Sequence, residues 1–563
     1  MSENNFERIV IEDYKSDFLY KKNKSNLNIT FNRIAFIFFV FLIVCSIYTI
    51  RVVYLGGLNV SKEDNINHLI KPNYRADIID NNGSFIVKSV RTINAGINPE
   101  LVMDKKKLLV SLQIIFPNKD FSKIKKKIYK KNFFYLKKKI SQQQYEKLRL
   151  LGEKSIIFEE KLTRIYPQEN LFSHVIGQID NDNNGISGIE KFFDYELKTR
   201  KEPLELTVDT DIQFLVREEL LKFEDIFRSK GSAAILMNVK NGNIISMVSL
   251  PDFNLNKREK INDEKYINRA TKGVYELGSV FKTFTVAAGI NEGEIEPGTI
   301  FEDLPKSITC AGRPIREYDN EIPTNLTAEE ILIRSGNIGS VRIAQMLGIE
   351  KFKNFLEKIG VLKKIELDIE EVGQPIPFRW GKCKLATSSF GHGITTTPLQ
   401  LAKAYAIISN GGYNIRPTLI KKNISENKIK SKILNDGVSK KINKMLRKIV
   451  STKEGTAGFA NIDGYQVGGK TGTAQKTIGG KYSKNKVNTF AAVFPTSKPQ
   501  YVLVTLLDEP KPSKDYIYHY NDGSGWKYKG TAYNTAGWTS VEVAGKIIEK
   551  IGPILATKYI EVK

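Results

Sequence analysis

The longest apolar stretch of the chain lies near its start. Residues Ile34 to Ile50 are nearly all apolar, and Val52 to Leu55 continue the run past Arg51. Together they supply roughly the 20 residues that a transmembrane helix needs, provided that the Arg51 guanidinium extends to the membrane surface. No other segment is comparably apolar. The pattern predicts one transmembrane helix over residues 34–55.

The basic residues that flank this helix predict its orientation. Four precede the apolar run closely and two follow it: Lys21, Lys22, Lys24 and Arg33, then Arg51 and Lys62. By the positive-inside tendency, residues 1–33 stay in the cytoplasm, and the rest of the chain lies in the periplasm, outside the inner membrane. A cleaved signal peptide is the alternative, but no small-residue cleavage site follows the run.

Past residue 203 the pattern changes to alternating strand-like and helix-like segments. Strands are predicted at Leu206–Val208, Ala233–Met237, Ile244–Val248, Thr489–Phe494 and Tyr501–Leu507, and helices at Phe281–Ile290, Ala328–Arg334 and Leu399–Ser409. Asn241-Gly242 predicts a tight turn between the second and third of these strands. This part of the chain is therefore predicted to mix helices with an antiparallel sheet.

Three short polar clusters lie in this region, in the order Ser279-Val280-Phe281-Lys282, Ser335-Gly336-Asn337, Lys470-Thr471-Gly472-Thr473. On a helix, Ser279 and Lys282 share a face, so a neutral Lys282 amine can take the proton of the Ser279 hydroxyl during attack on a carbonyl. Burial of Lys282 and the proximity of the cation Lys470 both favour that neutral form. These clusters predict a serine acyl-transfer site.

The other residues of the clusters suit the same chemistry. Ser335 can pass the proton to a leaving amine, and the Asn337 amide can hold a substrate peptide group. Lys470, Thr471 and Thr473 offer a cation and hydroxyls to a terminal carboxylate. Such a site fits substrates that end in D-Ala-D-Ala.

The order S-x-x-K, S-x-N, K-T-G is typical of penicillin-binding proteins and serine β-lactamases. Ser335 follows Ser279 by 56 positions and Lys470 follows it by 191. The flanking segments Asn268-Arg269-Ala270 and Tyr275-Glu276-Leu277-Gly278-Ser279 resemble class B penicillin-binding proteins, with Leu277 in place of the usual proline. Ser389-Phe390-Gly391-His392-Gly393 and Thr397-Pro398-Leu399-Gln400-Leu401 extend the resemblance. His392 is interpreted as a loop residue, since Lys282 already supplies the base.

This resemblance implies an α+β fold with a pedestal domain at residues 56–203 and a transpeptidase domain at residues 204–563. Within the pedestal, Arg75–Gly83, Arg164-Ile165-Tyr166-Pro167, His174–Gly177 and Gly188–Lys191 match the class B pattern, and Asn82-Gly83 predicts a hairpin turn. It also implies catalytic Ser279, Lys282 and Ser335, oxyanion donors at the backbone N–H groups of Ser279 and Thr473, and no cofactor. The implied substrate-binding residues are Asn337, Lys470, Thr471, Gly472 and Thr473.

The function implied is that of a septal peptidoglycan D,D-transpeptidase that cross-links stem peptides to an amine acceptor and is a β-lactam target. A β-lactamase is disfavoured because no E-x-x-L-N segment lies between Asn337 and Lys470. Asn337, and the tail segment Tyr533–Trp538, resemble division enzymes rather than elongation enzymes. An elongation enzyme and a catalytically silent β-lactam sensor remain the alternatives. The resemblance implies a SEDS-family glycan polymerase and other divisome membrane proteins as partners.

Composition adds a net charge of +24. Much of it is lysine, including a run from Lys123 to Lys139 with Phe133, Phe134 and Tyr135 among the lysines. This run favours an exposed helix face or an anionic lipid or cell-wall polymer over nucleic acid, because the predicted anchor places it outside the cell. Cys310 and Cys383 can form a disulfide or remain free thiols, and the four scattered histidines predict no metal site.

Overall fold

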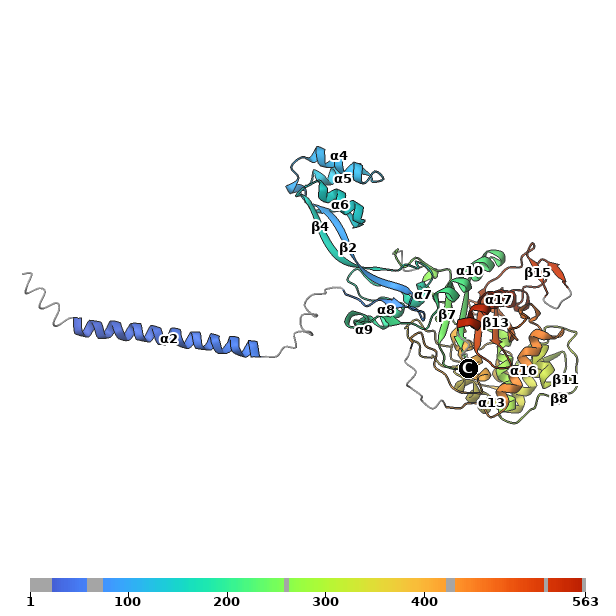
Figure 1. The fold of residues 1–563 in the computed structure, drawn as a ribbon. Helices are drawn as coiled ribbons and strands as arrows, with labels where there is room; N and C mark the ends of the chain where they lie inside the picture. The colour runs from blue at the N-terminus through green and yellow to red at the C-terminus, as the bar shows by residue number, and fades with distance from the viewer. Residues whose placement is uncertain (1–22, 58–73, 258–262, 422–430, 521–524, 559–563) are drawn as a thin grey trace, which may run out of the picture. The chain divides into compact units, whose positions relative to one another are not determined.

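The computed structural model describes residues 23–57, 74–257, 263–421, 431–520 and 525–558 (Figure 1). The chain divides into two compact units, Met1–Pro72 and Asn73–Lys563. The first unit contains helix α2, Asn23–Gly57. Its segment Arg33–Tyr54 has a mean hydropathy of 2.5, and none of it is buried. An apolar helix of 22 residues with no protein covering it fits a membrane anchor, as the hydrophobic pattern predicts.

The second unit begins with a mixed sheet and several short helices. Its strands are β1 (Ile78–Ile79), β2 (Phe85–Ile97), β3 (Phe134–Ile140), β4 (Ile156–Ile165) and β5 (Leu204–Glu205). Its helices are η2 (Pro99–Leu101), α4 (Lys105–Ile115), α5 (Phe121–Ile128), α6 (Gln142–Leu150), α7 (Ser173–Ile176), α8 (Gly188–Phe192) and α9 (Asp194–Thr199). β2 pairs antiparallel with β4 from Lys88↔Ile165 to Ile97↔Ile156. The predicted turn at Asn82-Gly83 joins β1 to β2, with Gly83 at φ +84°.

Three sequence segments that lie far apart converge at the base of this sheet. The buried Glu190 carboxylate accepts hydrogen bonds from Arg75 Nε at 2.5 Å and from Arg164 Nε at 2.8 Å. Arg75 also bonds the Asp194 carboxylate at 2.7 Å. Arg75 and Glu190 are fully buried, so removal of either one leaves an uncompensated charge inside the protein. This network joins the segment just before β1 to β4 and to α8.

The opposite end of the β2–β4 pair carries a small subdomain made by α4, α5, α6 and β3, called the head below (Figure 1). It has its own hydrophobic core, separate from the core of the rest of the unit. Ile124 and Ile128 of α5 point into this core, and the lysines between them are exposed. The predicted exposed lysine face is therefore confirmed for α5, whereas the later part of the run, residues 134–139, belongs to strand β3 and not to a helix.

A five-stranded antiparallel sheet lies at the centre of the C-terminal region, in the order β12-β13-β14-β6-β7. Its strands are β6 (Gly231–Asn238), β7 (Ile244–Leu250), β12 (Gly468–Ile478), β13 (Lys481–Phe494) and β14 (Tyr501–Asp508). β7 and β14 are buried at every position, so both faces of the sheet are covered. The helices that contact it include α10 (Thr210–Phe227), α15 (Pro398–Ser409) and α17 (Ser540–Lys558).

A helical region packs beside this sheet around α11, Phe281–Asn291, which is buried from Phe281 through Ile290. The other helices are α12 (Ala328–Ile333), α13 (Asn337–Lys358), α14 (Lys382–Ser388), α16 (Val438–Ser451), η3 (Glu264–Tyr266), η4 (Gly278–Val280), η5 (Gly458–Ala460) and η6 (Ala536–Trp538). The remaining strands are β8 (Ile300–Phe301), β9 (Ser307–Cys310), β10 (Arg313–Arg316), β11 (Leu326–Thr327), β15 (Ile517–His519) and β16 (Lys527–Lys529). α11 contacts α12, α13 and α16.

The predicted α+β fold is confirmed, with one correction. The strand predicted at Leu206–Val208 is wrong, because only Leu206 forms a bridge, to Ile420, and the Thr207 N–H bonds the Leu419 carbonyl at 2.8 Å. Leu206, Thr207 and Val208 are all buried, but they form a connecting segment and not a strand of the central sheet. One hydrophobic core extends from Ala76 to Leu555, so the base of the pedestal and the C-terminal region share it.

Candidate active site

Ser279 lies in η4, a 3₁₀ helix of one turn that directly precedes α11. Gly278 before it has φ +63°, and a Cβ there would lie 2.7 Å from the Thr473 carbonyl oxygen. A Cβ on Gly472 would lie 2.1 Å from the Leu277 carbonyl oxygen. Only glycine permits these approaches, so β12 passes directly against the turn that carries Ser279. The first and third sequence clusters are thereby brought together.

Two buried lysines meet at the second cluster. The Lys282 amine donates to the Ser335 carbonyl at 2.5 Å and to the Ser335 hydroxyl at 3.1 Å. The Lys470 amine donates to the same hydroxyl at 2.9 Å. Both lysine side chains are fully buried, and Ser335 itself is 4% exposed. One hydroxyl oxygen therefore accepts from amines that lie 188 positions apart in the sequence.

Ser335 occupies the turn between α12 and α13 with φ +59°, in the left-handed region. A residue other than glycine adopts this conformation only where its surroundings hold it there, and such residues concentrate at functional sites. Here the buried lysines bond both its carbonyl and its hydroxyl. The backbone conformation of Ser335 directs its hydroxyl between the two amines.

Burial changes the protonation of both amines. It lowers the pKa of Lys282 to about 7, while the negative charge of Glu317 acts in the opposite direction. Burial, and secondly the charge of Lys282, hold the pKa of Lys470 well below its ordinary value. Because both amines reach one oxygen, they lie within about 6 Å, where two positive charges repel by about 3 kcal/mol at an effective dielectric constant of about 20. The site therefore disfavours two protonated lysines near neutral pH.

The Ser279 side chain is half-buried, and no described residue hydrogen-bonds its hydroxyl. The Lys282 amine bonds Ser335 instead of Ser279. The structure thus places Ser279 one helical turn before Lys282 and against β12, without the direct contact between the Ser279 hydroxyl and the Lys282 amine that the sequence suggests.

The remaining predicted residues surround this group. Thr471 is 8% exposed, and its hydroxyl accepts from Lys470 at 3.2 Å and contacts the Thr456 hydroxyl at 2.8 Å. The Thr473 hydroxyl accepts the Ala536 N–H at 2.9 Å, which leaves its own proton available. The Asn337 amide donates to the Arg316 carbonyl at 2.8 Å. The structure brings all eight predicted site residues into one region.

Comparison with known proteins agrees with this geometry. Residues 232–524 match the family of the penicillin-binding protein transpeptidase domain, and residues 70–224 match the penicillin-binding protein dimerisation domain. The chain belongs to the penicillin-binding protein transpeptidase family. The two domains in succession confirm the class B penicillin-binding protein predicted from the sequence motifs.

Individual relatives extend over most of the chain. A probable peptidoglycan D,D-transpeptidase FtsI of Caulobacter vibrioides is 29% identical over 498 residues, 86% of this chain and 82% of the relative. The probable peptidoglycan D,D-transpeptidase PenA of Neisseria gonorrhoeae is 26% identical and covers 89% and 92%. Penicillin-binding protein 3 of Mycobacterium tuberculosis, in complex with aztreonam, has the same fold, with a TM-score of 0.65 and 20% identity over 86% of this chain and 97% of that one.

Several residues of this penicillin-binding protein's site were not expected from the sequence. Glu317 accepts the Asn337 N–H at 2.6 Å, and Thr456 and Ala536 bond the third cluster, as described above. Cys310 and Cys383 form a disulfide, which resolves the choice between paired and free thiols. These contacts join residues far apart in the chain. Ala536 lies in the tail segment Tyr533–Trp538 noted in the sequence, but no local pattern marks its contact with Thr473.

His392 lies beside the site without contacting the reacting groups. Its ring stacks on Tyr482 with centroids 4.6 Å apart, and its Nδ1 lies 3.9 Å from the Glu276 carboxylate. Glu276 also accepts the Gly393 N–H at 2.9 Å and the Tyr482 hydroxyl at 3.1 Å. These contacts agree with the interpretation of His392 as a loop residue.

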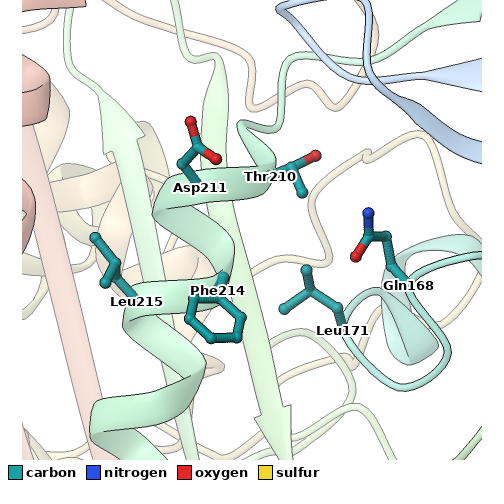
Figure 2. A pocket seen from close by; sticks show the side chains of 6 residues that line it. All are labelled: Gln168, Leu171, Thr210, Asp211, Phe214 and Leu215. Carbon is teal, nitrogen blue, oxygen red and sulfur yellow. The ribbon is translucent and has the colours of Figure 1, made fainter.

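A surface pocket elsewhere in the same unit contains none of the predicted site residues. Figure 2 shows its lining, which comes from the loop after β4 and the first turns of α10: Gln168, Leu171, Thr210, Asp211, Phe214 and Leu215. Phe214 and Asp211 are exposed, and no buried ionisable side chain points into the pocket. Its lining does not suit acyl transfer.

Proposed function

We propose that this protein is the septal peptidoglycan D,D-transpeptidase of its cell and works through an ester on Ser279. The observation that carries this proposal is the convergence of two fully buried lysine amines, from the first and third motifs, on the hydroxyl of Ser335. Such an arrangement supplies a base with a pKa near neutrality and a route for its proton. FtsI-type D,D-transpeptidases among the relatives support the septal assignment.

In the proposed reaction the Ser279 oxygen attacks the carbonyl of the penultimate D-Ala of a stem peptide. Lys282 takes the Ser279 proton and passes it through the Ser335 hydroxyl to the amine of the departing terminal D-Ala, so Lys282 is neutral again and Ser335 keeps one proton. The acyl group then remains on Ser279 as an ester. An amine of a second stem peptide attacks this ester, its proton returns through Lys282 to the Ser279 oxygen, and a new amide bond cross-links the two peptides.

The backbone N–H groups of Ser279 and Thr473 are the proposed donors to the carbonyl oxygen as it becomes negative. The approach of Gly278 to Thr473 supports this assignment, because it places the two backbone segments side by side. Removing one such donor typically costs about 2.7–4 kcal/mol of transition-state stabilisation. Gly278 and Gly472, which directly precede the two donors, are buried, which limits competition from water.

Lys470, Thr471, Gly472 and Thr473 are proposed to bind the terminal carboxylate of the donor peptide. The Thr473 hydroxyl already accepts the Ala536 N–H, so its proton can point to the carboxylate. Because Gly472 has no side chain, strand β12 can pass close to the Leu277 carbonyl beside the Ser279 turn. Asn337 is proposed to exchange its bond to the Arg316 carbonyl for one to a substrate peptide group.

The division role is proposed over elongation because of Asn337 and the tail segment Tyr533–Trp538, whose Ala536 supports Thr473. By the same resemblance, residues 1–33 are cytoplasmic, 34–55 cross the inner membrane, 56–203 form the pedestal, and 204–563 form a periplasmic transpeptidase domain. A SEDS-family glycan polymerase and other divisome membrane proteins are the proposed partners.

Labelling with a fluorescent penicillin tests the chemistry. The full chain in detergent is expected to form a covalent adduct, and Ser279→Ala is expected to form none. An equal adduct on Ser279→Ala would show that the nucleophile is wrong. Depletion from growing cells tests the process: filaments are expected for a division enzyme, whereas round cells would indicate elongation. Normal growth on Ser279→Ala alone would indicate a scaffold or sensor.

A further inference from the structure

A short segment that follows the hairpin β9–β10 lies across the second motif. The Glu317 carboxylate accepts the Asn337 N–H at 2.6 Å and the Ile338 N–H at 2.8 Å. The Asn337 amide donates to the Arg316 carbonyl, and the Tyr318 hydroxyl donates to the Arg334 carbonyl at 3.0 Å. Four hydrogen bonds therefore join residues 316–318, called the strap, to residues 334–338.

Glu317 replaces a cap that α13 lacks. The N-cap residue of α13 is Gly336, which has no side chain to accept the first N–H groups of the helix. The Glu317 carboxylate satisfies two of them and places a negative charge at the positive N-terminal end of α13, whose first helical part extends to the kink at Gly348. These N–H groups belong to Asn337 and Ile338, and Asn337 is separated from Ser335, which has φ +59°, by Gly336 alone. The backbone course of the second motif thus depends on Glu317.

The far end of the hairpin is fixed covalently. Cys310 at the end of β9 is bonded to Cys383 in the first turn of α14, with Cα atoms 5.5 Å apart. The end of α14 leads to Ser389, whose carbonyl accepts the Thr285 hydroxyl of α11 at 2.7 Å. Gly391 beyond it is so close to Gly278 that a Cβ would lie 2.0 Å from the Gly278 carbonyl oxygen. The disulfide thereby joins the strap to the loop that packs on the Ser279 turn.

We propose that Glu317 is a positioning residue for the second motif, and that the Cys310–Cys383 disulfide braces the strap that carries it. The bonds of Glu317 hold Ser335 and Asn337 in place beside Lys282 and Lys470, and the disulfide keeps the strap from leaving α13. The inference rests on the proposed acyl transfer at Ser279 and names residues that act through the motif, without contact to the substrate.

The charge of Glu317 has a second effect that separates it from a purely structural residue. Among the described residues, the charged groups that face Lys282 are Glu317, which raises the Lys282 pKa, and Lys470 from β12. Glu317→Gln keeps the size of the side chain and one acceptor oxygen but removes the negative charge. The Lys282 pKa then falls, so the amine becomes neutral at lower pH. Glu317→Ala removes the cap as well.

The test measures the second-order rate of acylation by a fluorescent penicillin from pH 5.5 to 9, on the full chain in detergent. Glu317→Ala is expected to slow acylation about tenfold to a hundredfold, since it leaves two helix N–H groups without a partner. Glu317→Gln is expected to lower the midpoint of the pH profile by about half a pH unit. The double variant Cys310→Ser, Cys383→Ser is expected to be slower by about threefold to tenfold. Glu321→Gln, an exposed carboxylate four residues away, is the matched control and is expected to retain the native rate and midpoint.

Native rates and an unchanged midpoint in both Glu317 variants would overturn the role of Glu317, and a native rate in the double cysteine variant would overturn the role of the disulfide. Should Glu317→Ala fail to fold, as seen by circular dichroism, the midpoint of Glu317→Gln decides alone. A failure of the proposed function is distinguishable, because then the native chain itself forms no Ser279 adduct and no rate can be compared.

Discussion

The two lysines of the active site and all but one of the lysines of the head lack an acidic partner among the described residues, but with opposite consequences. Between Asp104 and Arg149 the chain has 15 Lys and Arg against 3 Asp and Glu. Of these 15, Lys123 alone pairs with a described carboxylate, that of Asp120 at 3.7 Å. Lys282 and Lys470 likewise have no described carboxylate within ion-pair distance. Most head lysines are exposed, whereas the two active-site lysines are fully buried.

The difference shows that burial, and not the number of neighbouring cations, creates a base. Water stabilises the ammonium groups of the head and screens their repulsion. In the active site the protein excludes that water, so the pKa of Lys282 falls to about 7. Lys119 in the head is an intermediate case: its side chain is partly buried, and its pKa is lowered first by burial and then by Lys137 and Lys127. The large positive charge of this protein therefore says little about its chemistry.

Removal of one active-site lysine is expected to have the largest effect. Lys282→Gln removes the proposed base, and general-base catalysis typically contributes about 10²–10⁴-fold. Acylation by a fluorescent penicillin should slow by that factor, as measured by single-turnover labelling. The matched control is Lys125→Gln, Lys126→Gln, Lys127→Gln in the head, which should acylate at the native rate. A Lys282→Gln protein that reacts within tenfold of the native rate would contradict the assignment.

The sequence located the reacting residues better than the contacts that hold them. Ser279, Lys282 and Lys470 lie in short motifs whose spacing indicates their chemistry. The structure brings the two lysines together on Ser335 and places the Ser279 turn against β12. Glu317 could not be recognised, because its role depends on a hairpin that folds back onto α13. The convergence of separate motifs on Glu190 is likewise a tertiary contact that no local pattern reveals.

The same limit explains the incorrect strand and the cysteines. Leu206 alternates with its neighbours as a strand residue does, but the partner that it finds is Ile420, more than 200 positions away. Cysteine spacing does not determine pairing, since a disulfide requires the two Cα atoms to come within about 7 Å. At 73 residues of separation that distance is set by the fold alone.

The next prediction concerns His174, a buried base far from the reacting groups, and tests whether burial alone lowers the pKa of a base in this protein. His174 of α7 is 9% exposed, and its Nε2 lies 2.7 Å from the Lys265 carbonyl. Burial lowers its pKa to about 4 from an ordinary value of 6.5. Between pH 6.5 and 4, His174 is protonated in the unfolded chain but still neutral in the folded chain. The free energy of unfolding therefore falls as the pH falls through this range, by about 3 kcal/mol in total.

Urea unfolding at pH 7 and pH 4 measures this loss. In His174→Gln, which cannot titrate, the difference in the free energy of unfolding between the two pH values should shrink by about 3 kcal/mol. His519→Gln is the matched control, because His519 is exposed and its variant should retain the native difference. Equal pH dependence in native and His174→Gln proteins would mean that burial alone does not depress the pKa of a base here.

Removal of the second buried cation sharpens the electrostatic part of the comparison. Native acylation is expected to rise with pH through a midpoint near 7, as Lys282 becomes neutral. Lys470→Gln removes the second amine, and because burial is the cause of the lowered Lys282 pKa, the midpoint should stay within about half a pH unit of the native value. The position of the midpoint is the measurement, because weaker binding of the penicillin lowers the rate at every pH. A midpoint that rises by about 2 pH units would mean that repulsion from Lys470, and not burial, makes Lys282 neutral.

Loss of charge in the head is expected to have the smallest effect. Lys125, Lys126 and Lys127 lie in the last turn of α5, where the helix dipole favours positive charge while the neighbouring lysines oppose it. The two contributions have opposite signs and both act through water, so the triple glutamine variant should change the free energy of opening of the head by less than about 0.5 kcal/mol.

Amide hydrogen exchange of α4–α6 measures this free energy of opening, since the head has a core of its own. Repetition in 1 M salt, where the Debye length is about 3 Å, should remove even that difference. A change of several kcal/mol would show that the exposed lysines carry structural interactions comparable to those of the buried pair.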